Sequence, residues 1–509
     1  MKKILLATLN AKYIHANLGL RYLYANLEDL QPHTQLKEFT IKTRAIDIVE
    51  NILETKPAIV GFGVYIWNIE ETFAVVAQLK TVAPEIKIIL GGPEVSYESQ
   101  AHPIANHVDY IVTGAADKSF YQLCKDILNS RAPINQIINS KPLKLNELNY
   151  PYEYYTNEDL ANRLIYVEAS RGCPFKCEFC LSALDKTSYP FDLDEFLQQM
   201  DNLYQRGARH FKFVDRTFNL KINTTLKILD FFLERLDDKL FLHFEVIPDH
   251  LPEKLKDKLK AFPLGSLQFE IGIQTFNQQV QTLISRKQNN DKSKANLVWL
   301  RENTNAHIHA DLIFGLPGEK LETFANSFDE LYACHPHEIQ LGILKRLKGS
   351  PIIRHTDDYN LKFNPLPPYN ILSNSSVDFI TMQRVNRFAR YWDMLANSGR
   401  FKLSLPLLID ENPFDRFMML TEWLFQQTQQ THQINLKRLF ELLLNVSDLF
   451  PEIDNLKFIE LLQQDYEKTK LKGRLQISTV ANKLDSSNSD QASNKSHANR
   501  ATRQMRHIG

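Results

Sequence analysis

Three of the chain's five cysteines lie within eight residues, in the stretch RGCPFKCEFC at residues 171–180. Cys173, Cys177 and Cys180 form a C-x-x-x-C-x-x-C pattern, which is short enough to direct three sulfur ligands toward one inorganic centre. A structural zinc site would usually need four closing ligands, and the stretch has no fourth cysteine. An iron-sulfur cluster can instead leave one iron available to a small chelating molecule.

Two other interpretations of the cysteine triplet are a disulfide and a chance grouping of buried thiols. The chain has only five cysteines in 509 residues, and its first apolar run stops at Asn10 and Lys12, which is too short for a secretory signal. These features favour a reducing compartment, where clustered cysteines bind a metal or take part in catalysis. We therefore expect a cytoplasmic protein.

The three cysteines, with aromatic Phe179 directly before the last of them, resemble the signature of radical S-adenosylmethionine (SAM) enzymes. The resemblance implies a four-iron, four-sulfur (4Fe-4S) cluster held by the three thiolates, with SAM chelating the fourth iron. It also implies that an electron from the cluster cleaves SAM and releases a 5′-deoxyadenosyl radical. Reducing a sulfonium requires the negative end of the potential range of biological clusters. The expected partner is therefore a low-potential electron donor of the flavodoxin or ferredoxin type.

Length and composition indicate a soluble chain of several domains. Hydrophobic residues make up 43% of the chain and charged residues 24%, close to the average for folded domains. The 60 basic residues balance 60 acidic ones, so net charge predicts neither a nucleic acid nor a membrane as a partner. We find no uninterrupted apolar stretch of the roughly 18 residues that a membrane-spanning helix needs.

Residues 1–130 alternate strand-like apolar runs with helix-like segments, which predicts βαβ units. The predicted strands are residues 3–9, 35–41, 58–64, 86–90 and 109–112. These runs are continuous, as in a parallel sheet that is covered on both faces. Ligands of such a sheet bind outside the carboxyl ends of its strands, where this chain has Gly63, Gly91, Gly92 and Gly114.

Together with the cysteine motif, this Rossmann-like region resembles the cobalamin-binding domain that is fused to many radical SAM enzymes. The resemblance implies that bare backbone at Gly91 and Gly92 approaches the corrin or its nucleotide tail. Asn10, Tyr13 and His15, in the first strand-to-helix loop, are further candidate cobalamin contacts. Many cobalamin domains supply the lower cobalt ligand from a D-x-H-x-x-G motif here, but this loop lacks the Asp and its glycine falls one place late. His15 is therefore either a ligand or a loop residue that only borders the corrin.

Residues 131–161 lose this periodicity and gather prolines, which predicts a linker. Over residues 162–355 strands and helices alternate again, which predicts a partial (β/α)6 barrel by analogy with the closed eight-stranded barrel. The predicted strands are residues 163–170, 210–215, 240–247, 266–274, 307–314 and 338–344. Chemistry in such a barrel collects at the carboxyl ends of the strands.

Residues at these strand ends match the radical SAM pattern one by one. Asp215 stands where a polar group commonly accepts a hydrogen bond from the SAM amino group. Glu270 and Gln274 point to one face of an alternating strand and would hold the ribose and methionine portions of SAM. Gly315 would leave room beside the adenine. Without the cysteine motif, a salt bridge or helix cap would be the simpler explanation of Asp215 and Glu270.

A basic cluster follows the last predicted strand. Its members are Lys345, Arg346, Lys348 and Arg354. A solvated rim explains this cluster more simply than a phosphate site. Apolar residues at helical spacing predict an α-helical carboxyl-terminal domain over residues 370–475. Residues 478–509 are polar and of low complexity, and we expect a disordered tail.

The predicted fold is therefore α/β: a Rossmann-like cobalamin-binding domain, a radical SAM barrel and a helical carboxyl-terminal domain. The resemblance implies a cobalamin-dependent radical SAM enzyme, with methyl transfer to an unactivated carbon of an unknown substrate as the first expectation. One alternative is a non-methylating enzyme with the same cofactors, which cyclises, rearranges or oxidises its substrate. Another is a non-enzymatic sensor of cobalamin or SAM. Methylthiotransferases that modify tRNA need a second three-cysteine site, which this chain lacks.

Overall fold

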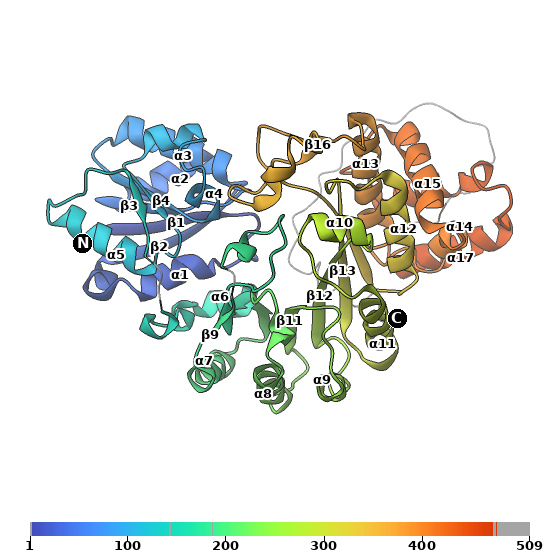
Figure 1. The fold of residues 1–509 in the computed structure, drawn as a ribbon, viewed down its shortest axis with the longest axis horizontal. Helices are drawn as coiled ribbons and strands as arrows, with labels where there is room; N and C mark the ends of the chain where they lie inside the picture. Colours follow the sequence, from blue (N-terminus) through green and yellow to red (C-terminus); the bar gives the residue numbers. More distant parts are fainter. Residues whose placement is uncertain (1–2, 142–143, 186, 472–474, 476–509) are drawn as a thin grey trace.

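The computed structural model describes residues 3–141, 144–185, 187–471 and 475. Figure 1 shows a blue amino-terminal unit beside a green and yellow barrel-like unit, with orange and red helices packed on the yellow side of the barrel. The tail predicted at residues 478–509 lies outside the described residues.

The amino-terminal unit is a six-stranded parallel sheet in the order β2-β1-β3-β4-β5-β6. Its strands are β1 (Ile4–Asn10), β2 (Thr34–Thr40), β3 (Ile59–Gly63), β4 (Lys87–Gly91), β5 (Tyr110–Thr113) and β6 (Ile137–Asn139). Its helices are α1 (Leu18–Ala25), α2 (Ala45–Leu53), α3 (Ile69–Val82), α4 (Pro93–Ser96) and α5 (Asp117–Leu128). Helices α2 and α3 bury Ile48 and Val75 against one face, and α1 and α5 bury Leu20 and Phe120 against the other. The Rossmann-like prediction is confirmed.

Residues 131–161, the predicted linker, hold more structure than their sequence suggests. Strand β6 joins the edge of the first sheet, and α6 (Asn157–Asn162) begins with a capping box at Thr156. Tyr152 and Tyr155 are buried in the core of the following unit. A three-residue strand is too short to show a period, so no sequence pattern indicates β6.

The second unit is a six-stranded parallel sheet in the order β14-β13-β12-β11-β10-β7. Its strands are β7 (Ile165–Val167), β10 (His210–Phe213), β11 (Phe241–Val246), β12 (Leu267–Gln274), β13 (His307–Phe314) and β14 (Glu338–Ile343). Its helices are α7 (Leu193–Gln205), α8 (Ile222–Leu233), α9 (Glu253–Leu259), α10 (Gln278–Leu283), α11 (Asn290–Asn303) and α12 (Leu321–Tyr332). Neighbours in this sheet follow chain order, as in an open (β/α)6 barrel, so this prediction is also confirmed.

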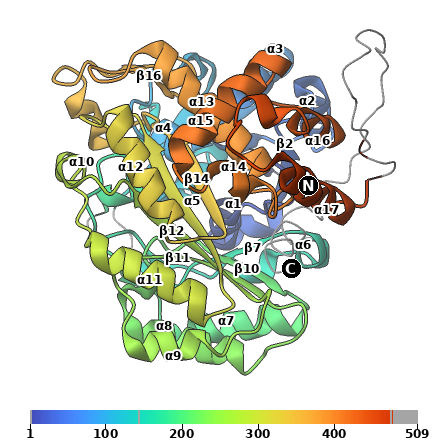
Figure 2. The same cartoon turned by 90° about the vertical axis from the view of Figure 1, so that its right-hand side faces the viewer.

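The carboxyl-terminal region is helical and shares its hydrophobic core with the barrel. Its helices are α13 (Phe379–Leu395), α14 (Leu405–Ile409), α15 (Pro413–Thr428), α16 (Leu436–Leu443) and α17 (Asn455–Lys468). Figure 2 shows α13 and α15 beside α12 of the barrel. The rings of Phe388 and Trp392 on α13 meet Phe328 on α12, so the aromatic residues of this region form a core.

Short elements complete the chain. Two small antiparallel pairs are β8 (Ser170–Arg171) with β9 (Tyr189–Pro190), and β15 (Lys362–Phe363) with β16 (Ile371–Ser373). The 3-10 helices are η1 (Glu28–His33), η2 (Pro103–His107), η3 (Leu145–Glu147), η4 (Tyr152–Tyr154), η5 (Leu181–Leu184), η6 (Phe218–Leu220), η7 (Pro351–His355) and η8 (Val446–Asp448).

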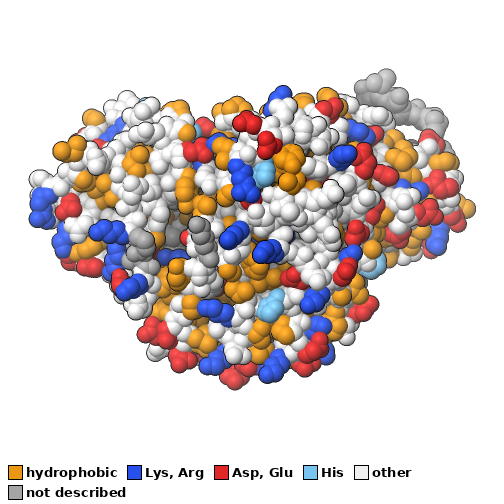
Figure 3. Space-filling model, viewed as in Figure 1, with side chains coloured by type: hydrophobic (Ala, Val, Ile, Leu, Met, Phe, Trp, Pro, Cys, Tyr) orange, Lys and Arg blue, Asp and Glu red, His pale blue; other side chains and the backbone are white. Residues whose placement is uncertain are grey.

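Basic and acidic side chains are interspersed over the face of the molecule shown in Figure 3. In the described part of the chain, none of the helices combines the length and the apolar character that crossing a membrane requires.

Candidate functional site

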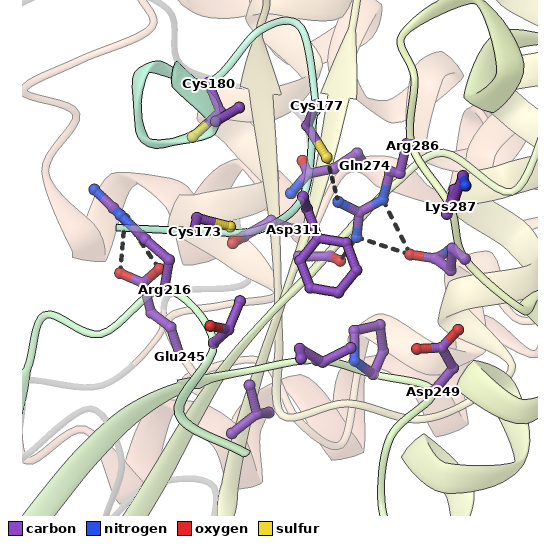
Figure 4. A pocket seen from close by; sticks show the side chains of 18 of the residues that line it. Cys173, Cys177, Cys180, Arg216, Glu245, Asp249, Gln274, Arg286, Lys287 and Asp311 are labelled. Carbon is purple, nitrogen blue, oxygen red and sulfur yellow. Dashed lines mark hydrogen bonds and ion pairs between the residues drawn. The ribbon is translucent and has the colours of Figure 1, made fainter. Parts of the chain in front are cut away.

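The cysteine loop runs from the end of β8 to the start of η5. Gly172 has φ +92°, and a Cβ there would lie 2.3 Å from the Thr187 carbonyl oxygen, so the turn into the loop requires glycine. Cys173 and Cys177 are buried and Cys180 is half-buried, and all three are free thiols. Figure 4 shows them around one end of a pocket.

Burial raises the pKa of the Cys173 and Cys177 thiols, and the Arg286 charge opposes this at Cys177. In the described part of the chain, no three His, Cys, Asp or Glu side chains converge closely enough to hold a single metal ion. The cysteines instead face a pocket that residues of β11, β12 and β13 also line.

The floor of this pocket holds two carboxylates side by side. Glu245 and Glu270 are register partners on β11 and β12. Arg216 Nη1 donates to both carboxylate oxygens of Glu245, at 2.8 and 2.9 Å. Glu270 Oε2 lies 2.9 Å from His243 Nε2 and 3.2 Å from Lys212 Nζ. Burial would raise the pKa of Glu270, but the His243 hydrogen bond and the Lys212 charge hold it well below its ordinary value. Each carboxylate therefore has its own cationic partner.

Two buried acceptor atoms in the pocket have no hydrogen-bond partner among the described residues: Gln274 Oε1 and Asp311 Oδ1. Asp311 Oδ1 approaches His309 Nε2 at 3.3 Å but lacks hydrogen-bond geometry. Gln274 has a left-handed backbone, with φ +68°, where the pairing of β12 with β13 is irregular. Its side chain lies over Gly272, where a Cβ would be 2.3 Å from Gln274 Nε2. An unpaired buried acceptor costs about 1–3 kcal/mol, so the pocket suits a ligand with hydrogen-bond donors.

Arg286 places a positive charge beside the cysteine loop. Its Nη1 lies 3.7 Å from Cys177 Sγ, its Nη2 donates to Gln288 Oε1 at 2.8 Å, and its guanidinium also donates to the Gly272 carbonyl oxygen. A fixed planar guanidinium suits a carboxylate ligand. No sequence spacing indicates Arg286 as a site residue, because its partner Cys177 is 109 residues away.

Glu178, inside the cysteine loop, anchors that loop to two other segments. Its buried carboxylate accepts a hydrogen bond from Ser285 Oγ at 2.6 Å, lies 2.8 Å from His355 Nε2 and is paired with Arg354. Its backbone donates to the Ile284 carbonyl oxygen at 3.1 Å. The cysteines are therefore held by long-range contacts that local spacing does not reveal.

The predicted SAM contacts fall into two groups. Phe179, Glu270 and Gln274 line the pocket together with the cysteines, whereas Asp215 and Gly315 lie outside its lining. Asp215 accepts hydrogen bonds from Ala169 N at 3.0 Å and Ser170 Oγ at 2.6 Å, and burial raises its pKa to about 7. A Cβ at Gly315 would lie 2.6 Å from Ile371 Cγ2, so that glycine allows close packing of the carboxyl-terminal region.

A second pocket lies at the carboxyl ends of the first sheet and is lined mainly by apolar side chains and glycines. Gly63, Gly91, Gly92 and Gly114, the four glycines predicted at this edge, all contribute to its lining. Gly92 has φ +110°, and a Cβ there would lie 2.4 Å from the Val64 carbonyl oxygen. Bare backbone at this edge suits a large flat ligand.

Asn10, Tyr13 and His15, the other predicted cobalamin contacts, lie outside the lining of this second pocket. Asn10 Nδ2 donates to the His15 carbonyl oxygen at 2.7 Å and to Glu38 Oε1 at 3.0 Å. Tyr13 donates to Glu158 Oε1 at 2.6 Å, and His15 Nδ1 lies 2.7 Å from the Tyr166 hydroxyl. In this structure, Tyr13 contacts the predicted linker and His15 contacts β7, whereas Asn10 contacts its own loop and β2.

Arg171 links the second pocket to the cysteine loop along the chain. It lines the second pocket and stands two residues before Cys173 of the first. Its guanidinium lies 2.6 Å from Glu168 Oε1, 3.6 Å from Asp117 Oδ2 and 4.8 Å from the centre of the Tyr22 ring. The glycine-lined pocket and the cysteine loop therefore adjoin along the chain.

Family models cover most of the chain. The Radical SAM superfamily model matches residues 167–331, so the second unit is a radical SAM domain. The B12 binding domain model matches residues 4–123, and a protein of unknown function model, DUF4080, matches residues 357–507. The chain thus belongs to the proteins that join a B12-binding domain to a radical SAM domain, and it adds a DUF4080 region.

Solved structures share this fold at low sequence identity. One is TsrM from Kitasatospora setae, a radical SAM methyltransferase solved with its tryptophan substrate and a SAM analogue. TsrM is 17% identical to this chain with a TM-score of 0.57, and the match covers 69% of this chain and 75% of TsrM. OxsB, a cobalamin-dependent SAM radical enzyme solved with aqua-cobalamin and SAM, is 12% identical with a TM-score of 0.62, over 92% of this chain and 84% of OxsB.

Among curated proteins, an uncharacterized methyltransferase of Pyrococcus horikoshii is 22% identical over 207 residues, which are 36% of this chain and 44% of that protein. The chain spans less than half the length of the curated relatives it matches.

Proposed function

We propose that the protein is a cobalamin-dependent radical SAM enzyme that transfers a methyl group to an unactivated carbon of its substrate. The observation that carries this proposal is that Arg171, which lines the glycine-lined pocket, stands two residues before Cys173, which lines the other pocket, because methyl transfer needs both cofactors near one substrate. The methyltransferase relatives support the choice of reaction.

In this proposal, Cys173, Cys177 and Cys180 hold a 4Fe-4S cluster, since three thiols share one end of a pocket with room for a chelating ligand. Gln274 and Asp311 accept hydrogen bonds from SAM, because Gln274 Oε1 is buried without a hydrogen-bond partner among the described residues and Asp311 Oδ1 has only its ion-pair contact with His309. Arg286 binds the SAM carboxylate.

The glycine edge of the second pocket holds cobalamin, with Gly91, Gly92 and Gly114 leaving the backbone open to the corrin or its tail. When bound, the cluster and SAM supply a hydrogen-abstracting radical, and cobalamin supplies a transferable methyl group. The chain's own part is to orient these groups and to keep water from them. A low-potential donor of the flavodoxin or ferredoxin type would supply the electrons.

Anaerobic reconstitution tests the cofactor assignment. Purified protein should contain about four irons, four sulfides and one corrin per chain, as the proposed cofactors require. Incubation with SAM and a strong reductant should give 5′-deoxyadenosine. A sensor that uses its cluster structurally would bind the cofactors without cleaving SAM.

A non-methylating reaction with the same cofactors is the second candidate, because the residues that line the two pockets bear on the cofactors and not on the fate of the substrate radical. Product mass separates the two candidates. Methyl transfer adds one methyl group to the substrate, and cyclisation, rearrangement or oxidation does not.

A further inference from the structure

A segment between the barrel and the carboxyl-terminal helices contacts residues next to the lining of both pockets. Residues 344–371, here called the strap, leave the end of β14 and return beside their own start. Ile371 N donates to the Leu344 carbonyl oxygen at 2.8 Å, and Arg346 N donates to the Tyr369 carbonyl oxygen at 3.0 Å. Figure 1 shows the golden strap between α4 of the first unit and α13. The strap is therefore a loop closed at its base and extended toward the B12-binding domain.

A buried ion pair joins the strap to α4. Lys348 Nζ lies 3.0 Å from Glu94 Oε1, and the Tyr369 hydroxyl donates to the same oxygen at 2.7 Å. Lys348 is 5% exposed and Glu94 is 4% exposed. A buried charge is costly without its partner, so each member of this pair depends on the other.

Two further contacts surround this pair. Arg346 Nη2 donates to both carboxylate oxygens of Glu98, at 2.8 and 2.9 Å. The Tyr97 ring lies against Gly349, where a Cβ would be 2.3 Å from the ring. Arg346 and Lys348 of the predicted basic cluster thus pair with acids of the B12-binding domain, instead of forming the solvated rim that the sequence favoured.

Helix α4 is also part of the glycine edge. It begins directly after Gly92, and Ser96 Oγ donates to the Gly92 carbonyl oxygen at 2.9 Å while it accepts from Gly114 N at 3.2 Å. A displacement of Glu94 would therefore shift the backbone at Gly91, Gly92 and Gly114, which lines the second pocket.

The other side of the strap holds the cysteine loop. His355 and Arg354 of η7 bind the Glu178 carboxylate, and Ile352 N donates to the Glu178 carbonyl oxygen at 2.9 Å. The strap is thus anchored by two buried glutamates: Glu94, two residues after Gly92 of the second pocket, and Glu178, between Cys177 and Phe179 of the first.

We propose that the strap sets the position of the glycine edge relative to the cysteine loop, with Lys348 and Tyr369 as positioning residues for corrin binding. The corrin part of this inference, that the strap affects corrin binding, rests on the proposed function. The mechanical part, that the strap holds the glycine edge in position, concerns the protein alone.

Hydrogen–deuterium exchange of the anaerobically purified full chain, without added cofactor, tests the mechanical part. In Lys348→Met, amides of residues 89–98 should exchange about tenfold faster than in the wild type, because Glu94 loses its buried counter-ion. Lys87→Met is the matched control. Lys87 starts β4 at the end away from Gly91 and pairs with Asp109, which keeps its contact with Lys80, so this variant should leave residues 89–98 unchanged.

In Lys348→Met, the buried Glu94 carboxylate has lost its counter-ion. The double variant Glu94→Gln with Lys348→Met also removes this carboxylate charge, so the exchange rate of amides at residues 89–98 should return toward the wild-type rate. Equal exchange in Lys348→Met and the wild type would overturn the proposal. If Lys348→Met does not fold, Tyr369→Phe decides the question. It removes one hydroxyl from Glu94 and should raise exchange at residues 89–98 several-fold, and an unchanged rate would overturn the proposal.

Titration with hydroxocobalamin, followed by absorbance, tests the corrin part. Lys348→Met should bind about tenfold more weakly than Lys87→Met, with the reconstituted iron content of both unchanged. Equal affinities would overturn the positioning role. If the wild type does not bind hydroxocobalamin, the proposed function fails, and the exchange comparison still decides whether the strap holds the glycine edge.

Discussion

Glu270 and Glu319 are two carboxyl groups near the first pocket. They differ in pKa because Glu270 has basic side chains beside it and Glu319 is enclosed without one. Glu270 has His243 and Lys212 beside it, which keep its pKa well below the ordinary value. Glu319, in the loop after β13, is fully buried, and its Oε1 accepts a hydrogen bond from Thr275 Oγ1 at 2.6 Å. Its Oε2 has no partner among the described residues, and burial raises its pKa to about 8. Glu319 is therefore protonated at neutral pH, behind the turn that carries Gln274.

The Glu319→Gln variant should remove a pH-dependent loss of stability. The folded protein holds the Glu319 proton up to about pH 8, whereas the unfolded chain releases it near 4.5, so stability falls as the pH rises between these values. Thermal melting should show Glu319→Gln close to the wild type at pH 5 and more stable by roughly 5 kcal/mol at most at pH 8.5, since each unit of pKa difference corresponds to about 1.4 kcal/mol. The same difference in stability between the variant and the wild type at pH 5 and at pH 8.5 would contradict a raised pKa of Glu319.

At the scale of elements, the sequence predicts what is local. The cysteine triplet and the glycines at the carboxyl ends of β3, β4 and β5 are recognisable because spacing along one segment carries the signal. Contacts such as Glu178 with His355 and Lys348 with Glu94 join residues from distant segments, and no spacing rule predicts them. The SAM and cobalamin roles given to Asp215 and His15 stay predictions, since both side chains bind other parts of the chain in this structure.

Gly92 offers a test of the turn between β4 and α4. Gly92→Ala should destabilise the first unit and weaken cobalamin binding, because its Cβ would lie 2.4 Å from the Val64 carbonyl oxygen. Gly207→Ala is the control, since Gly207 has φ +100° but a Cβ there would meet no atom within 4 Å. Both variants carry backbone strain of about 1–3 kcal/mol. Chemical denaturation should show a larger loss for Gly92→Ala, and equal losses would mean that Val64 does not confine this turn.

At the scale of the whole molecule, the barrel and the carboxyl-terminal helices form one hydrophobic core. Phe328 on α12 lies with its ring centroid 5.3 Å from Phe388, 4.8 Å from Trp392 and 5.8 Å from Phe414. The DUF4080 region therefore stabilises the barrel directly, in addition to any role in binding substrate.

Phe328→Ala should lower the free energy of unfolding by about 3–5 kcal/mol, as expected for a fully buried aromatic residue. Phe379→Ala, at the start of α13 with 49% of the residue exposed, should change it by less than about 0.5 kcal/mol. Thermal melting of the two variants gives the comparison. Similar melting temperatures would show that the contacts of Phe328 with the carboxyl-terminal helices do not stabilise the protein.

All of the proposed chemistry depends on one iron-sulfur cluster, which Cys173, Cys177 and Cys180 bind. This cluster must pass an electron to SAM. The decisive measurement is the yield of 5′-deoxyadenosine when each protein is incubated anaerobically with SAM and a strong reductant. The wild type is compared with Cys177→Ala and with the control Cys334→Ala. Cys334 is a buried cysteine outside the lining of both pockets. We expect 5′-deoxyadenosine from the wild type and Cys334→Ala, and none from Cys177→Ala, whose hydroxocobalamin binding stays near normal. Equal yields from Cys177→Ala and the wild type, or no product from a reconstituted wild type, would contradict the cluster assignment.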